Sequence, residues 1–342
     1  MLFLWKGSGS MLKLPKKYKN KLSLLETEVA VKKLKDYFEH RLAEKLQLIR
    51  VSAPIFVLSE TGINDNLNGV EDPVQFYVLD HEKAEIVHSL AKWKRFSLGS
   101  YHFEPGSGLY TDMNAIRKDE EIDNIHSYYV DQWDWEKIIK KEERTMDKLV
   151  EVVKQIYEVF LDTAEFITKE YPMLKIDLPE KLTFISSQEL EDRYPDLTPK
   201  EREAVLVREK KAVFITQIGG KLKSGKKHDG RSPDYDDWNL NGDLIFYNPI
   251  LDDALELSSM GIRVDRKSLL DQLEETNNLD RLGNPYHEMV ANDQLPYTIG
   301  GGIGQSRLCM FFLNKAHIGE VQVSVWDKEE IKLCQEHGIH LL

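Results

Sequence analysis

The chain has 342 residues, of which 41% are hydrophobic and 30% are charged, and its formal net charge is −12. This length and apolar content suffice for one large domain or two ordinary domains with a hydrophobic core. The negative charge argues against a duplex-binding surface, because affinity for nucleic-acid backbones depends on clustered Lys and Arg. No apolar run reaches the ~20 residues that a membrane-spanning helix needs. We therefore expect a protein that binds neither nucleic acid nor a membrane.

The cysteines and the N-terminal residues bear on compartment and domain boundaries. Cys309 lies in the apolar run 308–313, so we interpret it as a buried small hydrophobe rather than a nucleophile. Two cysteines form neither a disulfide framework nor a zinc pattern, and we expect a cytoplasmic protein. A Gly-Ser segment precedes a second methionine, Met11. We therefore interpret residues 1–10 as a tag or disordered extension and residues 11–342 as one domain.

The first predicted elements are a helix and an edge strand. The segment from Ser23 to Glu26 has the pattern of a capping box, and apolar residues then recur with helical spacing as far as residue 48. Residues 49–57 are β-prone, and Pro54 cannot donate to a strand ladder, so this strand is predicted at an edge or an interface. After an Asn- and Gly-rich loop, two short strands are predicted over 74–79 and 85–89.

A run of cations follows the second of these short strands, at Lys92, Lys94 and Arg95. Most runs of this kind form a solvated face, and the residues taken by themselves favour that interpretation. The alternative is a set of cations that faces a binding site.

Residues 109–117 and 127–135 are predicted to form an antiparallel hairpin, because two β-prone runs flank a charged connection. Side-chain alternation in the second strand puts Val130, Gln132 and Asp134 on one face and two tryptophans on the other. A Gln and an Asp on the same face can fix a ligand ammonium group. The alternative is a solvated sheet face.

The longest helical pattern covers residues 136–170, and Pro172 ends it. A second capping box begins at Thr198 and has proline at the first helical position. Further strands are predicted over 213–218, 244–247 and 254–264, and further helices over 266–272 and 286–292. One α+β domain built on an antiparallel sheet fits this order best.

The glycine-rich stretch 297–307 has four glycines in five positions, between a β-prone run and an apolar segment. It is typical of a strand whose backbone approaches a flat or phosphorylated ligand, followed by a helix that presents Arg307. A dinucleotide-binding fingerprint is disfavoured, because Gln305 and Arg307 occupy the positions of its third glycine. The remaining alternative is a glycine turn that merely lets a helix pack on a strand.

Two carboxylates, Asp243 and Glu256, stand at the ends of adjacent apolar strands. Hard oxygen ligands placed in this way suit Mg²⁺ that bridges phosphates. Small residues after Leu257 leave room for a nucleotide, and Arg263 is a candidate clamp for a carboxylate. The acidic and aromatic segment 231–238 is either a lid over a site or a surface loop, and its composition does not decide between them.

Together these segments resemble the catalytic domain of class II aminoacyl-tRNA synthetases. Residues 24–57 resemble its motif 1, residues 109–136 its motif 2 with Arg117 as the arginine, and residues 300–307 its motif 3 with Arg307. More specific strings resemble those of the ammonia-dependent asparagine synthetases, the aspartate–ammonia ligases. They are HSLAKWKR at 88–95, YVDQWDWE at 129–136, SQELEDRYPDL at 187–197, PDYDDW at 233–238, LNGD at 240–243 and ELSSMGIRVD at 256–265. The resemblance covers nearly the whole chain from Lys21 onward.

The resemblance implies a class II synthetase-like antiparallel sheet flanked by helices, and a two-step ligase reaction. ATP and L-aspartate give β-aspartyl-adenylate and pyrophosphate, and ammonia then gives asparagine and AMP. Arg117, Arg307 and Mg²⁺ on Asp243 and Glu256 would offset the phosphate charge. The resemblance also implies a homodimer formed through motif 1. A closing loop is expected to exclude water, and the 231–238 segment is our candidate.

The same resemblance implies roles for individual residues. Lys94 and Arg263 are expected to hold the α-carboxylate of aspartate, and Gln132 and Asp134 its amino group. The aspartates expected to bind ammonium and take its proton are Asp65 and Asp236. The implied substrate pocket comprises Asp65, Ser89, Lys94, Gln132, Asp134 and Arg263, and the implied ATP site comprises Arg117, Ser127, Val130, Leu257, Ser258, Gly302 and Arg307.

The chain departs from the tRNA synthetases at two motif 2 positions. Val130 stands in place of the aromatic residue that stacks on adenine, and Tyr129 in place of the glutamate that reads it. Recognition of adenine is therefore expected to fall to backbone groups over 127–130 and to Arg307.

Three alternatives are weighed against this interpretation. An aspartyl- or asparaginyl-tRNA synthetase-like paralogue would carry an anticodon-binding barrel before motif 1, where this sequence has some two dozen residues. An inactive paralogue is disfavoured because all candidate phosphate and metal residues are present. A glutamine-dependent enzyme would need an amidotransferase nucleophile, and Cys309 and Cys334 are both misplaced for that role.

Overall fold

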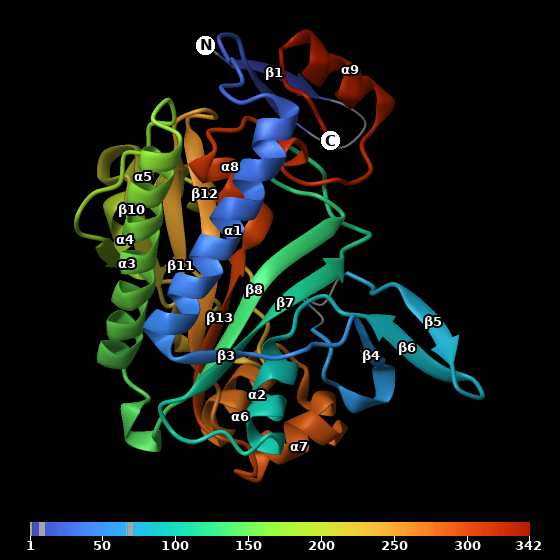
Figure 1. Cartoon of the computed structure of the whole chain (residues 1–342). Helices are drawn as coiled ribbons and strands as arrows, with labels where there is room; N and C mark the ends of the chain where they lie inside the picture. The colour runs from blue at the N-terminus through green and yellow to red at the C-terminus, as the bar shows by residue number, and fades with distance from the viewer. Residues whose placement is uncertain (1, 7–10, 66, 68–70) are drawn as a thin grey trace.

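An eight-stranded sheet forms the centre of the computed structural model, which describes the chain except for residues 1, 7–10, 66 and 68–70 (Figure 1). Neighbouring strands are antiparallel except at the two edges, where β3 runs parallel to β7 and β9 runs parallel to β10. The predicted α+β class with a largely antiparallel sheet is therefore confirmed. In spatial order the strands are β3 (Leu48–Arg50), β7 (Gly108–Ile116), β8 (Tyr129–Ile138), β13 (Thr298–Gly304), β12 (Asp253–Arg263), β11 (Asp236–Asn248), β10 (Ala212–Thr216) and β9 (Thr183–Ser186).

Three helices cover one face of this sheet, and the main hydrophobic core lies beneath them (Figure 1). The ring of Phe38 stacks on Trp133 with centroids 5.0 Å apart, and Phe160 lies 4.9 Å from Phe246. Burial of one such side chain contributes about 2 kcal/mol to folding. Trp133 and Trp135 thus point into the core, as the alternation of β8 predicts. The three helices are α1 (Leu24–Leu46), α3 (Met146–Glu170) and α8 (Gln305–Phe312).

On the other face of the sheet, β10 and the adjoining part of β11 carry apolar side chains that pack against α4 (Ser187–Arg193) and α5 (Pro199–Lys210), while polar side chains lie on β8, β12 and β13. A group of helices at one end of the sheet has its own small core around Val264 and Tyr286 (Figure 1). This group comprises α2 (Ala91–Ser100), α6 (Arg266–Glu275), η3 (Leu279–Gly283) and α7 (Pro285–Ala291). The helix α4 lies beside β9, and α5 packs across β10, β11 and β12. Within the described residues, no helix combines the length and apolarity that crossing a membrane requires.

Two smaller sheets lie outside the central one. A three-stranded sheet in the order β4 (Phe56–Leu58), β6 (Glu82–Ile86) and β5 (Gln75–Val78) projects to one side (Figure 1). A hairpin of β1 (Leu2–Lys6) and β2 (Met11–Pro15) lies near the C-terminal helix α9 (Lys328–Glu336). The prediction left residues 1–10 outside the fold, but the structure places Leu2–Lys6 in a strand. The Gly-Ser segment at 7–10 lies outside the described residues.

The segment 49–57 differs from the single edge strand that was predicted. It contains the end of β3 and the start of β4, which belong to different sheets, and Pro54 lies in the connection between them. Proline cannot donate to a ladder, so the chain leaves one sheet before it and joins the next after it.

The helix predicted over 136–170 begins ten residues later than expected. Residues 136–138 extend β8, because Glu136 is buried opposite Gly300 in the ladder and bonds Arg263. The helix α3 starts after Thr145, whose hydroxyl accepts a hydrogen bond from the Lys148 amide at 3.2 Å. Tertiary pairing of a strand thus overrode an apolar pattern with helical spacing. The short helices η1 (Ser59–Thr61), η2 (Lys141–Glu143) and η4 (Ile318–Glu320) complete the fold.

Candidate active site

A cavity of about 660 Å³ opens on the polar face of the central sheet. Its walls come from β8, β12, β13, the start of α2 and the segment before β11. Every predicted site residue except Asp243 lines it, and Asp243 contacts the lining residue Arg231. The predicted residues that line the cavity are Asp65, Ser89, Lys94, Arg117, Ser127, Val130, Gln132, Asp134, Asp236, Glu256, Leu257, Ser258, Arg263, Gly302 and Arg307.

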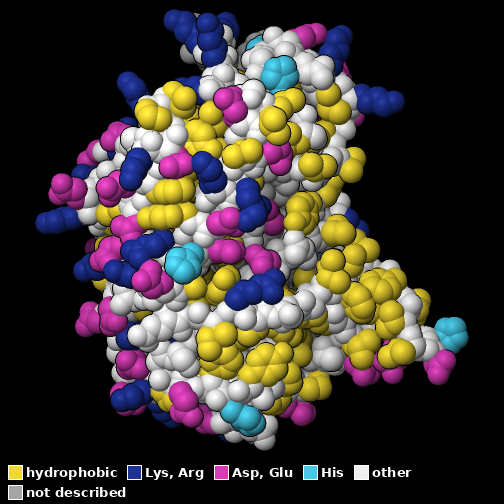
Figure 2. All heavy atoms as spheres, viewed as in Figure 1, with side chains coloured by type: hydrophobic (Ala, Val, Ile, Leu, Met, Phe, Trp, Pro, Cys, Tyr) yellow, Lys and Arg dark blue, Asp and Glu magenta, His cyan; other side chains and the backbone are white. Residues whose placement is uncertain are grey.

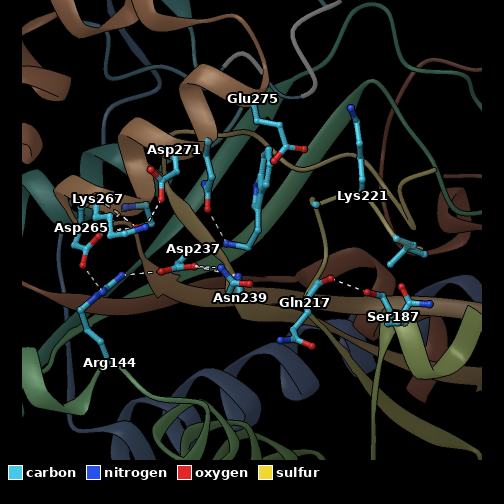
Figure 3. A pocket seen from close by; sticks show the side chains of 16 residues that line it. Arg144, Ser187, Gln217, Lys221, Asp237, Asn239, Asp265, Lys267, Asp271 and Glu275 are labelled. Atoms are coloured by element: carbon cyan, nitrogen blue, oxygen red, sulfur yellow. Dashed lines mark hydrogen bonds and ion pairs between the residues drawn. The ribbon is translucent and has the colours of Figure 1, made fainter. Parts of the chain in front are cut away.

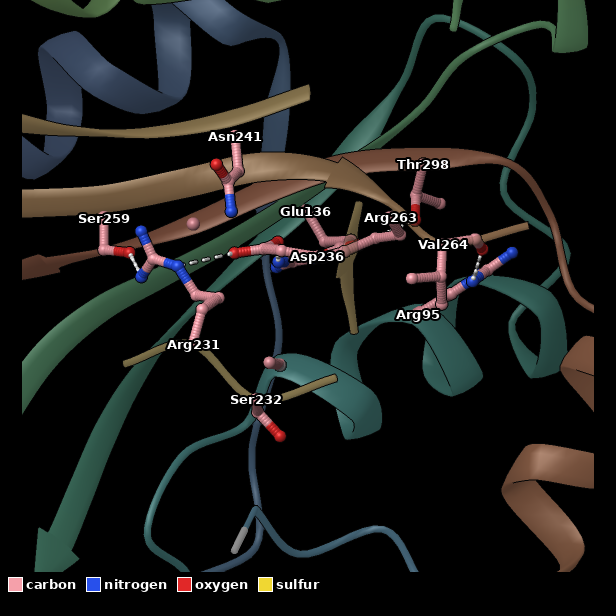
Figure 4. Close-up of polar contacts among 12 residues, drawn as sticks. Arg95, Glu136, Arg231, Ser232, Asp236, Asn241, Ser259, Arg263, Val264 and Thr298 are labelled. Atoms are coloured by element: carbon pink, nitrogen blue, oxygen red, sulfur yellow. Dashed lines mark hydrogen bonds and ion pairs between the residues drawn. The ribbon is translucent and has the colours of Figure 1, made fainter. Parts of the chain in front are cut away.

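A buried network of charges surrounds Arg263, which lines this cavity (Figure 4). The Arg263 guanidinium donates to Glu136 Oε1 from Nε at 2.9 Å and to Glu136 Oε2 from Nη2 at 2.7 Å, and it also donates to Asp236. Thr298 donates its hydroxyl to Glu136 Oε1 at 2.7 Å. Burial would raise the pKa of Glu136, but Arg263, with Lys94 and Thr298, opposes burial and lowers that pKa. Glu136 therefore holds one edge of the Arg263 guanidinium in place.

Sequence reasoning missed Glu136, although the signal was available. Glu136 follows Gln132 and Asp134 at intervals of two along β8, so it shares their face of the sheet. It was assigned instead to the start of a helix. We call Lys94, Asp134, Glu136, Asp236 and Arg263 the Arg263 network.

Lys94 joins this network from α2. Its ammonium donates to the Gly301 carbonyl oxygen at 2.8 Å and lies 3.4 Å from Asp134 Oδ2. Burial lowers the pKa of Lys94, and the Asp134 carboxylate opposes that shift. Asp134 also accepts a hydrogen bond from the Leu90 amide at 3.2 Å, which fixes the carboxylate against the start of α2.

The prediction of a solvated face for the cation run was wrong. Lys92, Lys94 and Arg95 are all buried, with at most 3% of each residue exposed. Lys92 lies 3.2 Å from Asp234, and Arg95 donates to the Val264 carbonyl oxygen at 2.7 Å (Figure 4). The partners come from segments far along the chain, which the local composition does not reveal.

The glycines of β13 leave room for two side chains of the Arg263 network, those of Asp134 and Glu136. A Cβ atom on Gly302 would lie 2.5 Å from Gln132 Oε1 and 2.7 Å from Asp134 Oδ1. A Cβ atom on Gly300 would lie 1.9 Å from Glu136 Oε2. The strand therefore needs glycine because polar side chains of β8 occupy the room above it. The predicted strand followed by a helix is confirmed at β13 and α8.

Asp65 and Asp236 approach the cavity from two separate segments. Asp65 is buried, and its Oδ2 accepts a hydrogen bond from the Ser89 hydroxyl at 2.9 Å. Burial raises the pKa of Asp236, while Arg263 and Arg231 oppose the shift. Both carboxylates raise the pKa of the Tyr235 phenol, after the larger effect of burial, so both act on the same region of the cavity.

The segment 231–238 is neither an exposed loop nor a free lid in this structure. Asp234 is fully buried and accepts from His287 at 2.9 Å and from Arg281 at 3.0 Å, while Asp236 begins β11. The segment therefore forms a packed wall of the cavity. Its closure over the site during the reaction stays a prediction.

A second group of charges surrounds Glu256, and we call Lys200, Arg231, Asp243, Glu256 and Arg307 the Glu256 cluster. Arg307 donates from Nη1 to the Glu256 carbonyl oxygen at 3.2 Å and from Nε to the Ile125 carbonyl oxygen at 3.1 Å. Burial raises the pKa of the Glu256 carboxyl, and the neighbouring Asp243 raises it further. Arg307, Lys200 and Arg231 oppose this shift. The cations therefore offset two carboxylates that repel each other.

Two carboxylates in this arrangement fit a hard cation such as Mg²⁺. Within the residues that the structure describes, no three His, Cys, Asp or Glu side chains group as a complete metal site. Mg²⁺ is usually held by one or two carboxylates together with water and substrate phosphates. Asp243 and Glu256 therefore stay predicted ligands.

The predicted nucleotide residues line the same cavity as Glu256. Arg117 donates from Nη2 to the His88 carbonyl oxygen at 3.3 Å, and its Nε is buried with no hydrogen-bond partner among the described residues. The hydroxyls of Ser127 and Ser324 share a hydrogen bond, with their Oγ atoms 2.7 Å apart, so the Ser127 hydroxyl already has a partner. The Ser258 hydroxyl donates to the Gly302 carbonyl oxygen at 2.9 Å and joins β12 to β13.

A second cavity of about 670 Å³ contains none of the predicted site residues (Figure 3). Arg144 spans one side of it, with its guanidinium 2.9 Å from Asp237 and 2.6 Å from Asp265. Lys221 and Glu275 stand across from these residues (Figure 3). Its mixed and self-paired charges mark no reaction centre, so we assign the chemistry to the first cavity.

Comparison with known proteins agrees with the geometry. A family model for aspartate–ammonia ligase matches residues 25–338. Aspartate–ammonia ligases of Clostridium perfringens and Fusobacterium nucleatum are 63% and 61% identical, over 96% and 95% of this chain and 98% and 99% of theirs. The solved asparaginyl-tRNA synthetase from Pyrococcus horikoshii, complexed with asparaginyl-adenylate, matches with a TM-score of 0.62 at 17% identity. That match covers 86% of this chain and 68% of the synthetase, and it confirms the predicted class II synthetase fold. The chain belongs to the aspartate–ammonia ligase family.

Proposed function

We propose that this chain synthesises L-asparagine from L-aspartate, ammonia and ATP through a β-aspartyl-adenylate, and releases AMP and pyrophosphate. Family membership over nearly the whole chain supports this reaction. The observation within the chain that carries it is that one cavity holds both the Arg263 network and the Glu256 cluster. The first suits an amino acid with two carboxylates, and the second suits a polyphosphate with its cation.

In the first step, an oxygen of the β-carboxylate of aspartate attacks the α-phosphorus of ATP, and pyrophosphate leaves. Lys94 and Arg263 would hold the α-carboxylate, because each retains N–H donors beyond those bonded within the protein. Gln132 and Asp134 would orient the amino group. Two reactants fixed in this way avoid the entropic cost of a bimolecular encounter.

Two arginines are proposed to act on the phosphates during this step. Arg117 and Arg307 both line the cavity, and their backbone contacts hold each guanidinium in place. Preorganised cations stabilise charge that develops on the leaving pyrophosphate. Asp243 and Glu256 would hold Mg²⁺, which when bound would neutralise phosphate oxygens. Adenine would be recognised by backbone groups near Ser127 and Val130 and by Arg307, and Leu257 and Gly302 would complete the ATP site.

In the second step, ammonia attacks the activated β-carbonyl carbon, and AMP leaves with the bridging oxygen. Asp65 and Asp236 are our candidates for binding ammonium and taking its proton. Burial makes Asp236 a stronger base than an exposed aspartate, and Ser89 fixes Asp65 through a hydrogen bond.

The responsible residue is the one whose Asn variant removes the acid limb of the pH profile of kcat/KM for ammonium. A limb unchanged in both variants would exclude both.

We also propose a homodimer formed through α1 and the segment after it, and a cytoplasmic location. Leu25 is 75% exposed, Ile49 60% and Ile55 56%, which supports a covered surface there. Figure 2 shows further hydrophobic side chains over the projecting sheet of β4, β6 and β5. Ile49→Glu combined with Ile55→Glu should give monomers in sedimentation velocity, and a wild-type monomer would refute the dimer. Both cysteines are free and buried, as a reducing compartment permits.

The proposed reaction is tested with purified protein, ATP, Mg²⁺ and aspartate, with ammonium or glutamine added. We expect asparagine and AMP in equal amounts with ammonium, and no asparagine with glutamine alone. Asparagine formed from glutamine but not from ammonium would overturn the proposal. Formation of aspartyl-tRNA in a parallel assay would favour the tRNA synthetase-like alternative instead.

A further inference from the structure

We propose that Arg231 is a built-in counter-cation for Asp243, which a divalent cation must displace before it can bind. Arg231 lies in the wall segment before β11 (Figure 4). Its Nη2 donates to Asp243 Oδ1 at 2.6 Å, and its Nη1 donates to the Ser259 hydroxyl. This inference rests on the proposed role of Asp243 and Glu256 as metal ligands.

The burial of this ion pair is what makes the contact significant. The side chains of Arg231 and Asp243 are 9% and 8% exposed, so solvent screens their attraction little. A buried carboxylate without a partner is costly, and Asp243 also faces the carboxylate of Glu256. Arg231 therefore supplies, in the nucleotide-free protein, a positive charge that a metal ion would otherwise supply.

The guanidinium and a metal ion would compete for the same place. A divalent cation bound to Asp243 needs the lone pairs of its oxygens, and Arg231 occupies one of these oxygens. A guanidinium left beside the metal would repel it. The nucleotide-free protein should therefore bind divalent cations weakly, and phosphate oxygens that arrive with the nucleotide would provide both ligands and negative charge.

Arg231 also has a second carboxylate within reach when it leaves Asp243. Its Nε lies 4.0 Å from Asp236 Oδ2 and has no hydrogen-bond partner among the described residues. Asp236 is itself bonded to Arg263, so the two ends of the cavity are joined through this one side chain. When a metal ion displaces Arg231 from Asp243, the movement of Arg231 would thus change the charge beside Asp236.

The test measures binding of Mn²⁺ to nucleotide-free protein by electron paramagnetic resonance. Arg231→Gln should bind Mn²⁺ about tenfold more tightly than wild type, because the competing charge is gone. Arg208→Gln is the matched control, since Arg208 pairs with Asp252 at an exposed site with Nε 2.9 Å from Oδ1. The control should bind Mn²⁺ as wild type does. The double variant Arg231→Gln with Asp243→Asn should lose the gain.

The outcomes separate this inference from the proposed function. The inference alone would be overturned by two results together. Wild type and Arg231→Gln would bind Mn²⁺ with equal affinity, and Mn²⁺ would still bind when a non-hydrolysable ATP analogue is present. A gain that survives Asp243→Asn would also overturn it. Absence of Mn²⁺ binding in every variant, even with the analogue, would instead overturn the proposed metal ligands and the inference with them. Arg231→Met, which keeps an unbranched side chain and removes the charge, replaces Arg231→Gln if circular dichroism shows that the latter does not fold.

Discussion

At the scale of single residues, the charged side chains that line the cavity are positioned by ion pairs with other buried charged side chains. Arg263 could face a substrate carboxylate because Glu136 and Asp236 already bind part of its guanidinium. Burial of a guanidinium without a partner would cost free energy, and a guanidinium whose N–H groups were all bonded would have no donor left for a substrate. Glu136 is therefore a positioning residue in this account, since it acts through Arg263.

Glu136→Gln should raise the KM for aspartate about tenfold or more, because one partner of a charged bidentate pair is lost. The KM for ATP should change little. Thr298→Val is the matched control, since it removes only the 2.7 Å bond to Glu136 and should have a smaller effect. Steady-state kinetics with each substrate varied separately check this. Equal increases of both KM values would show that Glu136 merely maintains the fold.

Arg117→Ala should abolish release of pyrophosphate while the fold stays intact. Among the described residues, the Arg117 side chain makes only a 3.3 Å bond to the His88 carbonyl oxygen and a 3.9 Å contact with Glu120, so the fold depends little on it. Loss of an arginine that stabilises phosphate charge costs about 10²–10³ in rate. Pyrophosphate release and circular dichroism are measured together. Normal adenylate formation in this variant would refute our assignment of motif 2.

At the scale of elements, the wall segment before β11 is held by one carboxylate with four partners. Asp234 lies 3.2 Å from the Lys92 ammonium on α2, and His287 on α7 and Arg281 on η3 contact the same oxygen. Ser232 donates to its other oxygen at 2.7 Å. This carboxylate thereby ties the segment that carries Arg231 and Asp236 to the helical group beside the cavity.

Asp234→Asn should destabilise the protein by about 3 kcal/mol at pH 7, because it leaves Lys92 and Arg281 buried without their counter-charge. Burial would raise the pKa of Asp234, but Lys92 and His287 hold it well below its usual range. A depressed carboxyl pKa stabilises the fold above the unfolded value and loses that effect as pH falls through the folded pKa. The difference between variant and wild type should therefore shrink below about pH 4.

Denaturant unfolding at several pH values measures this difference. The control is Asp252→Asn, whose carboxylate is 55% exposed and which should cost less than about 1 kcal/mol. A difference for Asp234→Asn that persisted unchanged into acid would mean that the charge of Asp234 is not what stabilises the segment.

At the scale of the whole molecule, much of the fold could be predicted from the sequence because local signals agreed with tertiary structure. The capping boxes at Ser23 and Thr198 begin α1 and α5, and the alternation in β8 separates Trp133 from Gln132 as expected. The family resemblance then added site residues that lie far apart along the chain, and the cavity brings them together.

What could not be predicted depends on long-range partners. The charge run of α2, taken by itself, favoured a solvated face, but Lys92 lies beside Asp234 and Lys94 bonds the backbone of Gly301. Polar residues at the start of β11 looked like a loop, yet Asn241 bonds both backbone groups of Ile218 at 2.8 Å and so extends the strand. Local composition carries no information about such contacts.

The central claim is that the β-carboxylate of aspartate is activated by transfer of AMP. The most direct test uses aspartate labelled with ¹⁸O in its β-carboxylate, together with ATP, Mg²⁺ and ammonium, and mass spectrometry of the products. We predict one ¹⁸O atom in AMP and one in asparagine, because the bridging oxygen leaves with the nucleotide. Label in inorganic phosphate, or AMP without label, would contradict the account.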